Sequence, residues 1–326
     1  MVSTPQTTSH VADQPGRPMY PRPSIYQHPL AYLIGLEGVA LMRAFAGEFD
    51  RQFTDARLAE VRRLLDAAAV LGEGTEIAPM SPVAGYDGWA ALYDDPENGL
   101  FAIEEPVVHP ILDRLPTGIA VDAACGTGRH AAYLAQRGHQ VHGFDASPRM
   151  LEIARTKVPG GRFAESDLRS IPLPSSSVDV VVCALALAHI EHLEPVFCEV
   201  ARVLRPGGHF VISDTRGHFI GSPLYPLVKS DLDGHLGYIP TWRHSTSAYL
   251  GAALPHGFLV RACQEPLRPE VPVNLSDPPT PAPPEDPSEP PNVWDLHAWA
   301  PEAANAIYQS EPCLIVWDFA LAEDSP

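Results

Sequence analysis

Hydrophobic and polar positions change their spacing in a regular order along the middle of the chain. Short apolar runs with the length of buried strands occur at 118–122, 140–144, 162–164, 178–185 and 209–213. Stretches with apolar residues at helical spacing lie at 103–115, 129–137, 148–157 and 194–204. Strands that alternate with helices of this length predict an α/β fold, with a mainly parallel sheet and helices on both faces. The apolar runs have few polar breaks, which fits strands that are buried on both sides.

The N-terminal part of the chain predicts additions to this α/β core. Residues 1–29 contain six prolines and little apolar content, so we expect a disordered tail. Residues 30–72 predict a helical N-terminal extension whose second helix is capped by Thr54 or Asp55. This extension could serve as a lid or as a homodimer surface, or its helices could simply pack on the main domain.

The segment after the fifth predicted strand breaks the alternation. Residues 215–245 have weak periodicity, so we expect an irregular insertion on the substrate side of the sheet. Residues 264–292 contain eleven prolines and six acids, which predicts a Pro-rich acidic loop. Apolar runs at 258–263 and 313–319 predict two further strands, the last of which returns to the same sheet. The main domain is therefore expected to consist of residues 73–263 and 312–320, with seven strands.

Composition excludes several classes of partner. Apolar residues make up 45% of the chain and charged residues 19%, which is enough to bury a core. The formal net charge is −18, so nucleic acids and anionic membrane surfaces would be repelled. The five cysteines include no Cys-x-x-Cys pair, which argues against a disulfide framework and a structural zinc site. Because no membrane-spanning apolar run and no recognisable signal peptide occur, we expect a cytoplasmic protein.

A glycine-containing turn joins the first predicted strand to the next helix. The strand ends in Asp122, and Gly126 and Gly128 lie in the turn, where N–H groups of the helix N-terminus can face a ligand. This segment resembles the first motif of the class I S-adenosylmethionine-dependent methyltransferases, Asp-x-Gly-x-Gly-x-Gly, with Ala124 in place of the first glycine. Alanine would be tolerated there if the residue keeps a negative φ.

The same turn also fits the pattern of a dinucleotide-binding site. Gly126, Gly128 and Ala131 satisfy the glycine spacing of that pattern. Asp145 lies 19 residues beyond Gly126, where a ribose-binding acid belongs. Asp122 favours the methyltransferase interpretation, because a carboxylate beside the turn would repel a pyrophosphate and would suit a methionine ammonium.

Later segments resemble the other motifs of this family in the family's order. Asp145 ends the second strand, and the resemblance implies that its carboxylate accepts both ribose hydroxyls. Asp167 and Leu168 resemble the third motif, whose carboxylate accepts from the adenine amino group and whose apolar side chain packs on the ring. The resemblance covers roughly residues 85–263 and 312–320, and it implies a Rossmann-like methyltransferase fold with S-adenosyl-L-methionine as the cofactor.

The expected cofactor site combines these motif residues with a tyrosine that could cover the cofactor. Its members are Tyr86, Asp122, Ala124, Gly126, Gly128, Asp145, Ala146, Met150, Asp167, Leu168 and Ala184. Acids at the carboxyl ends of strands suit a ligand that carries a sulfonium and an ammonium. For any one acid, capping of the following helix is the alternative role.

Histidine is the natural candidate for a general base near neutral pH. His189 follows the fourth predicted strand, whose end faces the methyl group in this family, so it is our candidate for the catalytic residue. Ordering of a loop is the alternative role for His189. His218 and His130 are weaker candidates for the base.

The predicted insertion carries aromatic and imidazole side chains that could line a pocket for a small molecule. The candidate substrate-binding residues are His218, Tyr225, His235, Tyr238 and Trp242, with His244 nearby. Tyr93 and Trp89 could also form a substrate wall, although core packing is the better interpretation for Trp89. We expect no metal site, because the neighbouring Asp231 and Asp233 are typical of solvated surface.

The sequence therefore predicts methyl transfer to an O, N or C nucleophile of a small molecule. A role in secondary metabolism, such as antibiotic biosynthesis, is an expectation from composition and from the habits of the family. Two alternatives remain open at this point. The protein could bind S-adenosylmethionine and catalyse a cyclisation or elimination, because a fold does not fix a function. It could also act as a non-catalytic partner of another protein.

Overall fold

The computed structural model describes residues 23–95, 98–216, 224–268, 296–308 and 312–323. Its largest sheet contains seven strands among these residues. They are β3 (Ile119–Ala123), β4 (Gln140–Asp145), β5 (Arg162–Glu165), β6 (Val178–Ala184), β7 (Leu204–Thr215), β10 (Phe258–Gln264) and β11 (Leu314–Leu321). Their order across the sheet is β10-β11-β7-β6-β3-β4-β5.

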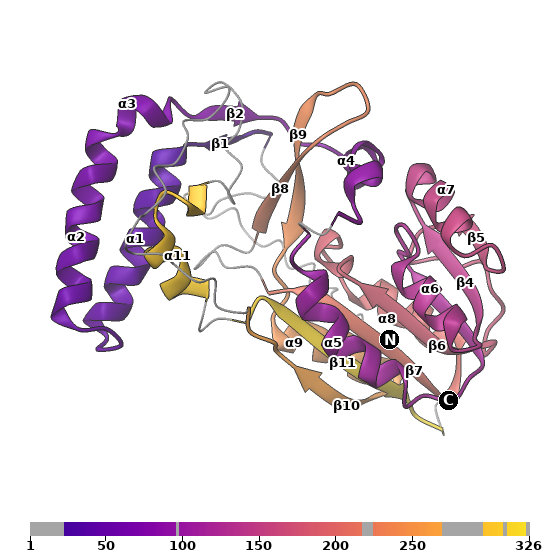
Figure 1. Cartoon of the computed structure of the whole chain (residues 1–326). Helices are drawn as coiled ribbons and strands as arrows, with labels where there is room; N and C mark the ends of the chain where they lie inside the picture. Colours follow the sequence, from indigo (N-terminus) through magenta and orange to yellow (C-terminus); the bar gives the residue numbers. More distant parts are fainter. Residues whose placement is uncertain (1–22, 96–97, 217–223, 269–295, 309–311, 324–326) are drawn as a thin grey trace, which may run out of the picture.

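The sheet is mainly parallel, as the sequence predicts. β7, β6, β3, β4 and β5 are joined by parallel pairings, whereas β11 is antiparallel to both β7 and β10. β11 lies between two strands that come much earlier in the chain, which confirms the prediction that the last strand returns to the same sheet. Figure 1 shows this strand running through the sheet beside β7 and β10.

Helices cover both faces of the sheet and bury alternate side chains of its strands. The helices are α5 (Phe101–Leu112), α6 (Arg129–Gln136), α7 (Pro148–Lys157), α8 (Glu194–Val203) and α9 (Thr246–Ala253). Val121 and Val181 face α8 and α9, whereas Ala120 and Val180 face α5 and α6. Side chains that point alternately to opposite faces explain why the strands are apolar at almost every position. None of the helices in the described part of the chain is long and apolar enough to cross a membrane.

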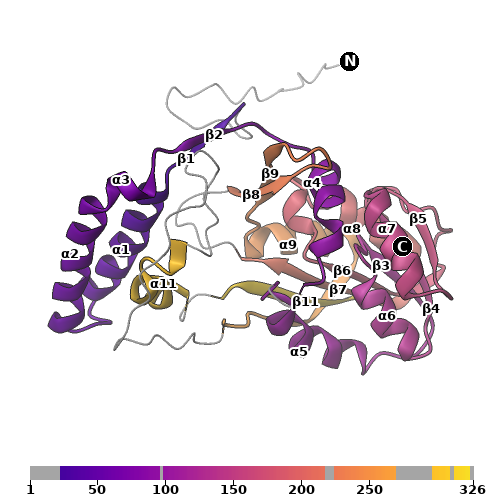
Figure 2. The same ribbon diagram turned by 45° about the horizontal axis from the view of Figure 1, so that its top comes forward.

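The predicted helical extension forms a separate cluster beside the sheet domain (Figures 1 and 2). It consists of α1 (Pro29–Phe45), α2 (Arg51–Asp66) and α3 (Ala68–Leu71), joined by α11 (Pro301–Tyr308) from the C-terminal part of the chain. We call these four helices the helical unit. The cap of α2 is Asp50, which accepts from the backbone N–H of Phe53, and not the expected Thr54 or Asp55. The sequence analysis assigned no structure to the segment that forms α11.

A buried arginine joins three helices of the helical unit. Arg57 on α2 donates to Glu37 on α1 at 3.2 Å and to Glu302 on α11. Burial raises the pKa of Glu37 to about 7, although the charge of Arg57 opposes this shift. The ion pairs add a polar tie to the apolar contacts of Leu33 and Leu64, which are fully buried in the same cluster.

Two predictions about loops are wrong. The tail was expected to extend to residue 29, but β1 (Ile25–Gln27) pairs with β2 (Thr75–Ile77), and residues 1–22 lie outside the described residues. The insertion at 215–245 was expected to be irregular, but β8 (Leu224–Ser230) and β9 (Leu236–Trp242) form an antiparallel hairpin. The two strands pair over seven residues each, a regularity that the mixed composition of the segment obscured. Most of the predicted Pro-rich loop lies outside the described residues.

The hairpin links the helical unit to the sheet domain. The chain leaving β2 pairs with β9, since the N–H of Tyr238 donates to Ala78 and the N–H of Met80 donates to Tyr238. The next helix, α4 (Pro82–Trp89), begins at the cap Ser81 and packs against the hairpin. Gly88 comes so close to β8 that a Cβ atom there would lie 2.1 Å from the carbonyl oxygen of Ser230.

We predict that Gly88→Ala destabilises the protein by about 2 kcal/mol, because the added methyl group would have to push α4 away from the backbone of β8. Chemical denaturation measures this change in the free energy of unfolding. Gly38→Ala in α1 is the matched control, since nothing lies within 4 Å of its Cβ position. It should stabilise the protein by about 0.5–1 kcal/mol through helix propensity. Equal effects of the two substitutions would contradict the close contact.

Candidate functional site

A cavity of about 580 Å³ lies at the carboxyl ends of β3, β4, β5 and β6. Its volume is within the usual range for a site that binds a cofactor or small molecule. The predicted site residues that line the cavity are Tyr86, Ala124, Asp145, Ala146, Met150, Asp167, Leu168, Ala184 and His189. The structure therefore brings together residues from four strand ends and from α4, which lie up to about a hundred positions apart in the sequence.

The turn between β3 and α6 has a backbone that its sequence only partly indicated. Ala124 has a φ of +57°, so the condition under which alanine would be tolerated at this position, a negative φ, is not met. The position needs the left-handed conformation that glycine adopts at no steric cost. Gly128 has a φ of +80° and begins α6, and a Cβ atom there would lie 3.0 Å from the side chain of Ala154 on α7.

Asp122 binds the backbone of the helix that follows this turn. It is buried, and its Oδ2 accepts from the N–H of Ala131 at 2.7 Å in the first turn of α6. Burial raises the pKa of Asp122 to about 6. Asp122, Gly126 and Gly128 are not among the residues that line the cavity. Their direct contact with a cofactor remains a prediction, whereas helix capping by Asp122 is what the structure displays.

Asp145 at the end of β4 is the carboxylate that faces the cavity most directly from the sheet. Its Oδ2 accepts from the N–H of Gly126 at 2.8 Å, and its Oδ1 accepts from the N–H of Ser147 at 2.8 Å. Burial raises its pKa, although these backbone donors oppose the shift. Each oxygen keeps a second lone pair, so the carboxylate can still accept from the two hydroxyls of a ribose.

Asp167 follows β5 in the cavity lining and is held in place by Arg169. The guanidinium donates from Nε to Oδ1 at 2.8 Å and from Nη2 to Oδ2, and these bonds lower the pKa of Asp167. The neighbouring Leu168 lines the cavity with an apolar surface. A carboxylate beside an apolar side chain is a suitable arrangement for an adenine ring with an amino group.

Tyr86 and His189 form a hydrogen-bonded pair in the cavity wall. The Tyr86 hydroxyl lies 2.7 Å from His189 Nε2, and Nδ1 faces the carbonyl of Pro240 at 3.5 Å. With the hydrogen on Nδ1, Nε2 accepts a hydrogen bond from the Tyr86 hydroxyl. Burial lowers the pKa of His189 to about 4 and raises that of Tyr86 well above its usual value. The imidazole is therefore neutral at physiological pH.

A buried acid that the sequence analysis did not single out holds the short helix that carries His189. Asp214 at the end of β7 accepts from the N–H of Ala188 at 3.2 Å and from the Tyr249 hydroxyl at 2.7 Å. Burial raises the pKa of Asp214 to about 7. His244, a predicted pocket residue, lies 3.1 Å from the carbonyl of Leu187 and supports the same helix, η2 (Leu187–His189).

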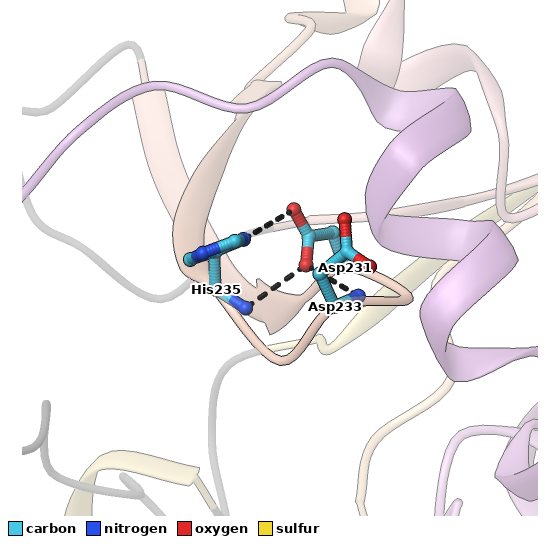
Figure 3. Close-up of side chains that lie close together, drawn as sticks. All are labelled: Asp231, Asp233 and His235. Carbon is cyan, nitrogen blue, oxygen red and sulfur yellow. Dashed lines mark hydrogen bonds and ion pairs between the residues drawn. The ribbon is translucent and has the colours of Figure 1, made fainter.

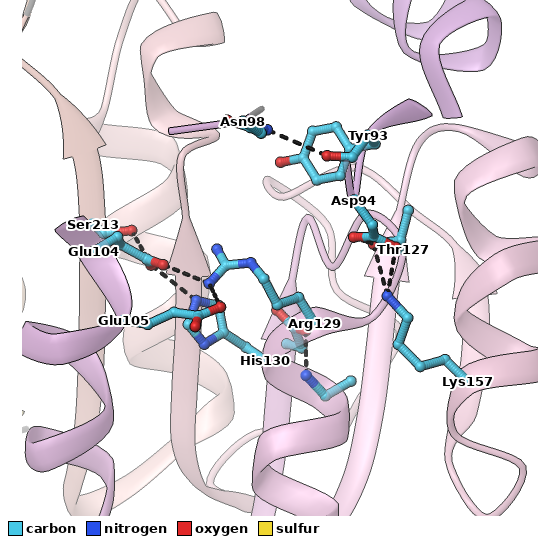
Figure 4. Close-up of polar contacts among 12 residues, drawn as sticks. Tyr93, Asp94, Asn98, Glu104, Glu105, Thr127, Arg129, His130, Lys157 and Ser213 are labelled. Carbon is cyan, nitrogen blue, oxygen red and sulfur yellow. Dashed lines mark hydrogen bonds and ion pairs between the residues drawn. The ribbon is translucent and has the colours of Figure 1, made fainter. Parts of the chain in front are cut away.

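Acidic side chains attach the segment above the cavity to the sheet domain. Asp87 on α4 accepts from the hydroxyl of Ser147, the cap of α7. Asp94 accepts from Thr127 and Lys157, each at 2.7 Å (Figure 4). These contacts place α4, and with it Tyr86, over the cavity.

A second polar cluster fixes α5 beneath this segment (Figure 4). Glu104 is fully buried and accepts from Arg129, from Nε2 of His130 at 2.8 Å and from Ser213 at 2.7 Å. Burial raises the pKa of Glu104, but the two basic partners outweigh burial and hold it below its usual range. His130, the weaker base candidate, thus lies in a structural cluster and does not line the cavity.

The predicted substrate residues of the hairpin do not line the cavity. Tyr238 is fully buried, His235 is exposed at the turn and Trp242 is partly exposed. His218 and the side chain of Tyr225 lie outside the described part of the structure. The physical reason is that the hairpin packs against α4, so α4, and not the hairpin, contributes side chains to the cavity wall.

Further residues that line the cavity come instead from α4, from the loop after η2 and from the start of α8. They are Pro82, Val83, Ile190, Glu191, His192 and Pro195. The sequence analysis did not identify them, because they form no motif and become neighbours only through the position of α4. Only the fold shows that the apolar residues Pro82, Val83, Ile190 and Pro195 face the same cavity.

Three potential metal ligands meet at the tip of the hairpin (Figure 3). Ligand atoms of Asp231, Asp233 and His235 lie within 4.8 Å of one another. The carboxylate of Asp231 also accepts from the N–H groups of Asp233 and His235, each at 2.9 Å. These bonds shape a turn, and exposed acids in a turn are ordinary solvated surface.

Comparison with known proteins decides between the two cofactor patterns. The family described as "Methyltransferase domain" matches residues 121–212, which run from β3 to β7. Residues 121–212 therefore form a methyltransferase domain of the class I S-adenosylmethionine-dependent type. The mainly parallel seven-stranded sheet with a single antiparallel strand, β11, is consistent with this family. S-adenosyl-L-methionine is therefore the cofactor to which the cavity has to be compared.

Relatives of this methyltransferase match its central part. A malonyl-[acyl-carrier protein] O-methyltransferase of Pectobacterium atrosepticum is 38% identical over 73 residues, which are 22% of this chain and 29% of that relative. Methyltransferase-like protein 27 of Homo sapiens is 37% identical over 111 residues, which are 32% of this chain and 45% of that relative. The chain thus spans less than half the length of these curated relatives.

Solved structures with the same fold cover more of the methyltransferase. The [4+2]-cyclase SpnF has a TM-score of 0.51 at 17% identity, over 76% of this chain and 97% of that chain. An S-adenosylmethionine-dependent methyltransferase from Mesorhizobium loti has a TM-score of 0.48 at 21% identity, over 67% of this chain and 97% of that chain. Similarity at this level concerns the fold.

We predict that Ala124→Gly raises the free energy of unfolding by about 0.5–1 kcal/mol. The left-handed conformation costs alanine about 1–2 kcal/mol, of which the greater freedom of glycine in the unfolded chain takes back a part. Chemical denaturation tests this expectation. Ala123→Gly in the adjacent strand is the control and should lower stability by about 1 kcal/mol. A loss of stability in both variants would refute the strain at Ala124.

We predict that Asp214 makes stability fall as pH rises from about 4 to about 7. Its raised pKa means that the native state holds the proton more tightly than the unfolded chain, so deprotonation in this interval favours unfolding. Relative to Asp214→Asn, the unaltered protein should lose about 2–4 kcal/mol between pH 4 and pH 8. Urea denaturation at several pH values measures the difference. The exposed Asp66→Asn should give a parallel pH profile, and parallel profiles for both variants would rule out the effect.

Proposed function

We propose that this protein transfers a methyl group from S-adenosylmethionine to a small molecule. The observation that carries the proposal is one cavity that contains both the strand-end carboxylate Asp145 and the Tyr86–His189 pair. At one end lie side chains suited to the adenosyl group, and at the other lies an apolar wall that could hold an acceptor. A distance of a few ångströms between donor and acceptor is the main requirement for this reaction.

The cavity fits the cofactor on chemical grounds. Asp145 is half-buried, has a raised pKa and can accept further hydrogen bonds, so hydroxyl donors would complete its hydrogen bonding. Asp167 and Leu168 would hold the adenine, and Ala146 and Met150 would pack beside the adenosyl group. When bound, S-adenosylmethionine supplies an activated methyl carbon on a sulfonium sulfur.

Tyr86 and His189 would act on the acceptor mainly by position. A base with a pKa near 4 takes up a proton poorly at neutral pH, and Nε2 already accepts from Tyr86. The catalytic role that the sequence suggested for His189 therefore becomes, in our proposal, orientation of Tyr86 and exclusion of water. Asp214 and His244 would support this role by holding η2.

Finer features of the function also remain proposals. We place the protein in the cytoplasm and in secondary metabolism, as its composition and family led us to expect. The relative from Pectobacterium atrosepticum is named for methylation of a malonyl group on an acyl-carrier protein. A homodimer through the helical unit is supported by Leu58 and Leu65 on α2, which are exposed seven residues apart on one side of the helix.

A cyclisation is the second candidate, and the observation in its favour is the fold shared with the cyclase SpnF. The weakly basic His189 is compatible with a reaction that needs no proton removal. Product mass separates the two candidates. A gain of one methyl group together with S-adenosylhomocysteine supports methyl transfer, whereas an isomer of the substrate supports cyclisation.

We predict that Asp145→Ala weakens the binding of S-adenosylmethionine by 10- to 100-fold, about 1.4–2.8 kcal/mol, because charge-assisted hydrogen bonds are lost. Isothermal titration measures the dissociation constant, and thermal unfolding checks that the variant is folded. Asp179→Ala is the matched control. Asp179 also accepts from a backbone N–H, that of Ile119 at 2.7 Å, but at the opposite edge of the sheet. An unchanged dissociation constant for a folded Asp145→Ala would count against the proposed site.

A further inference from the structure

The charges around the cavity restrict what an acceptor can carry, given the function proposed above. Three carboxylates line the cavity, those of Asp145, Asp167 and Glu191. Arg169 is the one lysine or arginine among the described lining residues, and its Nε and Nη2 both donate to Asp167, so its charge is paired. The cavity therefore offers no unpaired guanidinium or ammonium group, within the described residues, to receive a carboxylate or phosphate.

Glu191 is the carboxylate that remains available for an acceptor. It is exposed at the rim, and its side chain forms no ion pair or hydrogen bond with the described residues. Asp167 is held by Arg169, and Asp145 already accepts from two backbone N–H groups at the cofactor end. A positive group on the acceptor would find in Glu191 a partner that none of the described residues satisfies.

The walls near Glu191 are apolar. Pro82 and Val83 of α4 line the cavity, and so do Ile190 after η2 and Pro195 in the first turn of α8. An acceptor would bury a hydrocarbon or aromatic skeleton between these elements, which is the usual way in which a pocket binds a small molecule. The site thus combines an apolar slot with a negative charge at its mouth.

Proton transfer sets a second restriction. A hydroxyl acceptor must lose its proton as the new bond forms, and this requires a base of suitable strength nearby. Two imidazoles line the cavity among the described residues, His189 and the exposed His192. His189 is the more buried one, and its pKa near 4 and its bond with Tyr86 make it a poor base. An amine in its neutral form has a lone pair and needs no base during the transfer.

We infer that the acceptor is an amine on an apolar skeleton and that Glu191 binds its charged group. A protonated amine first releases one proton to water. The nitrogen lone pair then forms the bond to the methyl carbon as the sulfur–carbon bond breaks. The electron pair of the broken bond stays on sulfur. The positive charge passes from sulfur to nitrogen, so the product is a methylated ammonium ion that the surrounding carboxylates stabilise.

The test compares three probes with one skeleton and different charges: phenethylamine, 2-phenylethanol and 3-phenylpropionate. Their binding to the full chain saturated with S-adenosylhomocysteine is measured by ligand-detected NMR at pH 8, where an ordinary imidazole is neutral. We expect the amine to bind best and the carboxylate worst. Glu191→Gln should weaken binding of the amine by about three- to tenfold and leave that of the alcohol unchanged.

Glu73→Gln is the matched control, because Glu73 is an exposed glutamate beside β2 and is not part of the cavity. It should leave the order of the probes unchanged. Equal or tighter binding of the carboxylate, no binding of the amine, or no effect of Glu191→Gln would overturn the inference. Titration of the same samples with S-adenosylhomocysteine separates this failure from that of the proposed cofactor site, which is contradicted if the cofactor product does not bind.

Discussion

The cavity depends on one carboxylate at the end of a buried strand. Asp145 accepts from Gly126 in the turn after β3 and from Ser147 at the start of α7, so two loops from different strands are held on either side of one charge. Burial makes this charge costly, as the raised pKa of Asp145 shows. A ligand that donates hydroxyl groups to the same oxygens would reduce the cost. The group that shapes the site is thus also the group that a ribose would satisfy.

The segment above the cavity is held from two sides, and both are needed to place Tyr86. On one side, Asp87 and Asp94 bind to the helices that follow β3 and β4. On the other side, Gly88 lies against the backbone of β8. Because β9 also pairs with the chain that leaves β2, the helical unit, the hairpin and α4 form one continuous connection. The contact between Tyr86 and His189 therefore rests on elements that are far apart in the sequence.

The sheet and half of the site could be predicted because their information is local. An apolar run such as 178–185 defines a buried strand wherever its neighbours lie, and an acid at its end identifies the ligand edge. Asp145, Asp167 and Leu168 were found in this way, and all of them line the cavity. The family resemblance supplied the roles of these residues, which apolar spacing alone does not reveal.

The other half depends on contacts that no local pattern encodes. Tyr238 on β9 is fully buried, but the aromatic composition of the segment suggested a pocket wall. The helix α11 forms because the α1–α2 pair offers an apolar groove and a buried arginine to it, which its own eight residues do not indicate. Ala124 looked compatible with a negative φ because only the path of the turn requires a positive one. Long-range packing decided each of these features.

The state of His189 changes what the cavity contributes to the reaction. Its hydrogen bond with Tyr86 and its burial both come from the position of α4, so the same packing that closes the cavity also weakens the base. A site built in this way gains orientation and dryness at the expense of proton abstraction. With Asp145 and Glu191 nearby, it stabilises positive charge more readily than it generates a negative nucleophile. The position of α4 thus determines both the closure of the cavity and the weak basicity of His189, and the acceptor that we propose follows from the second of these.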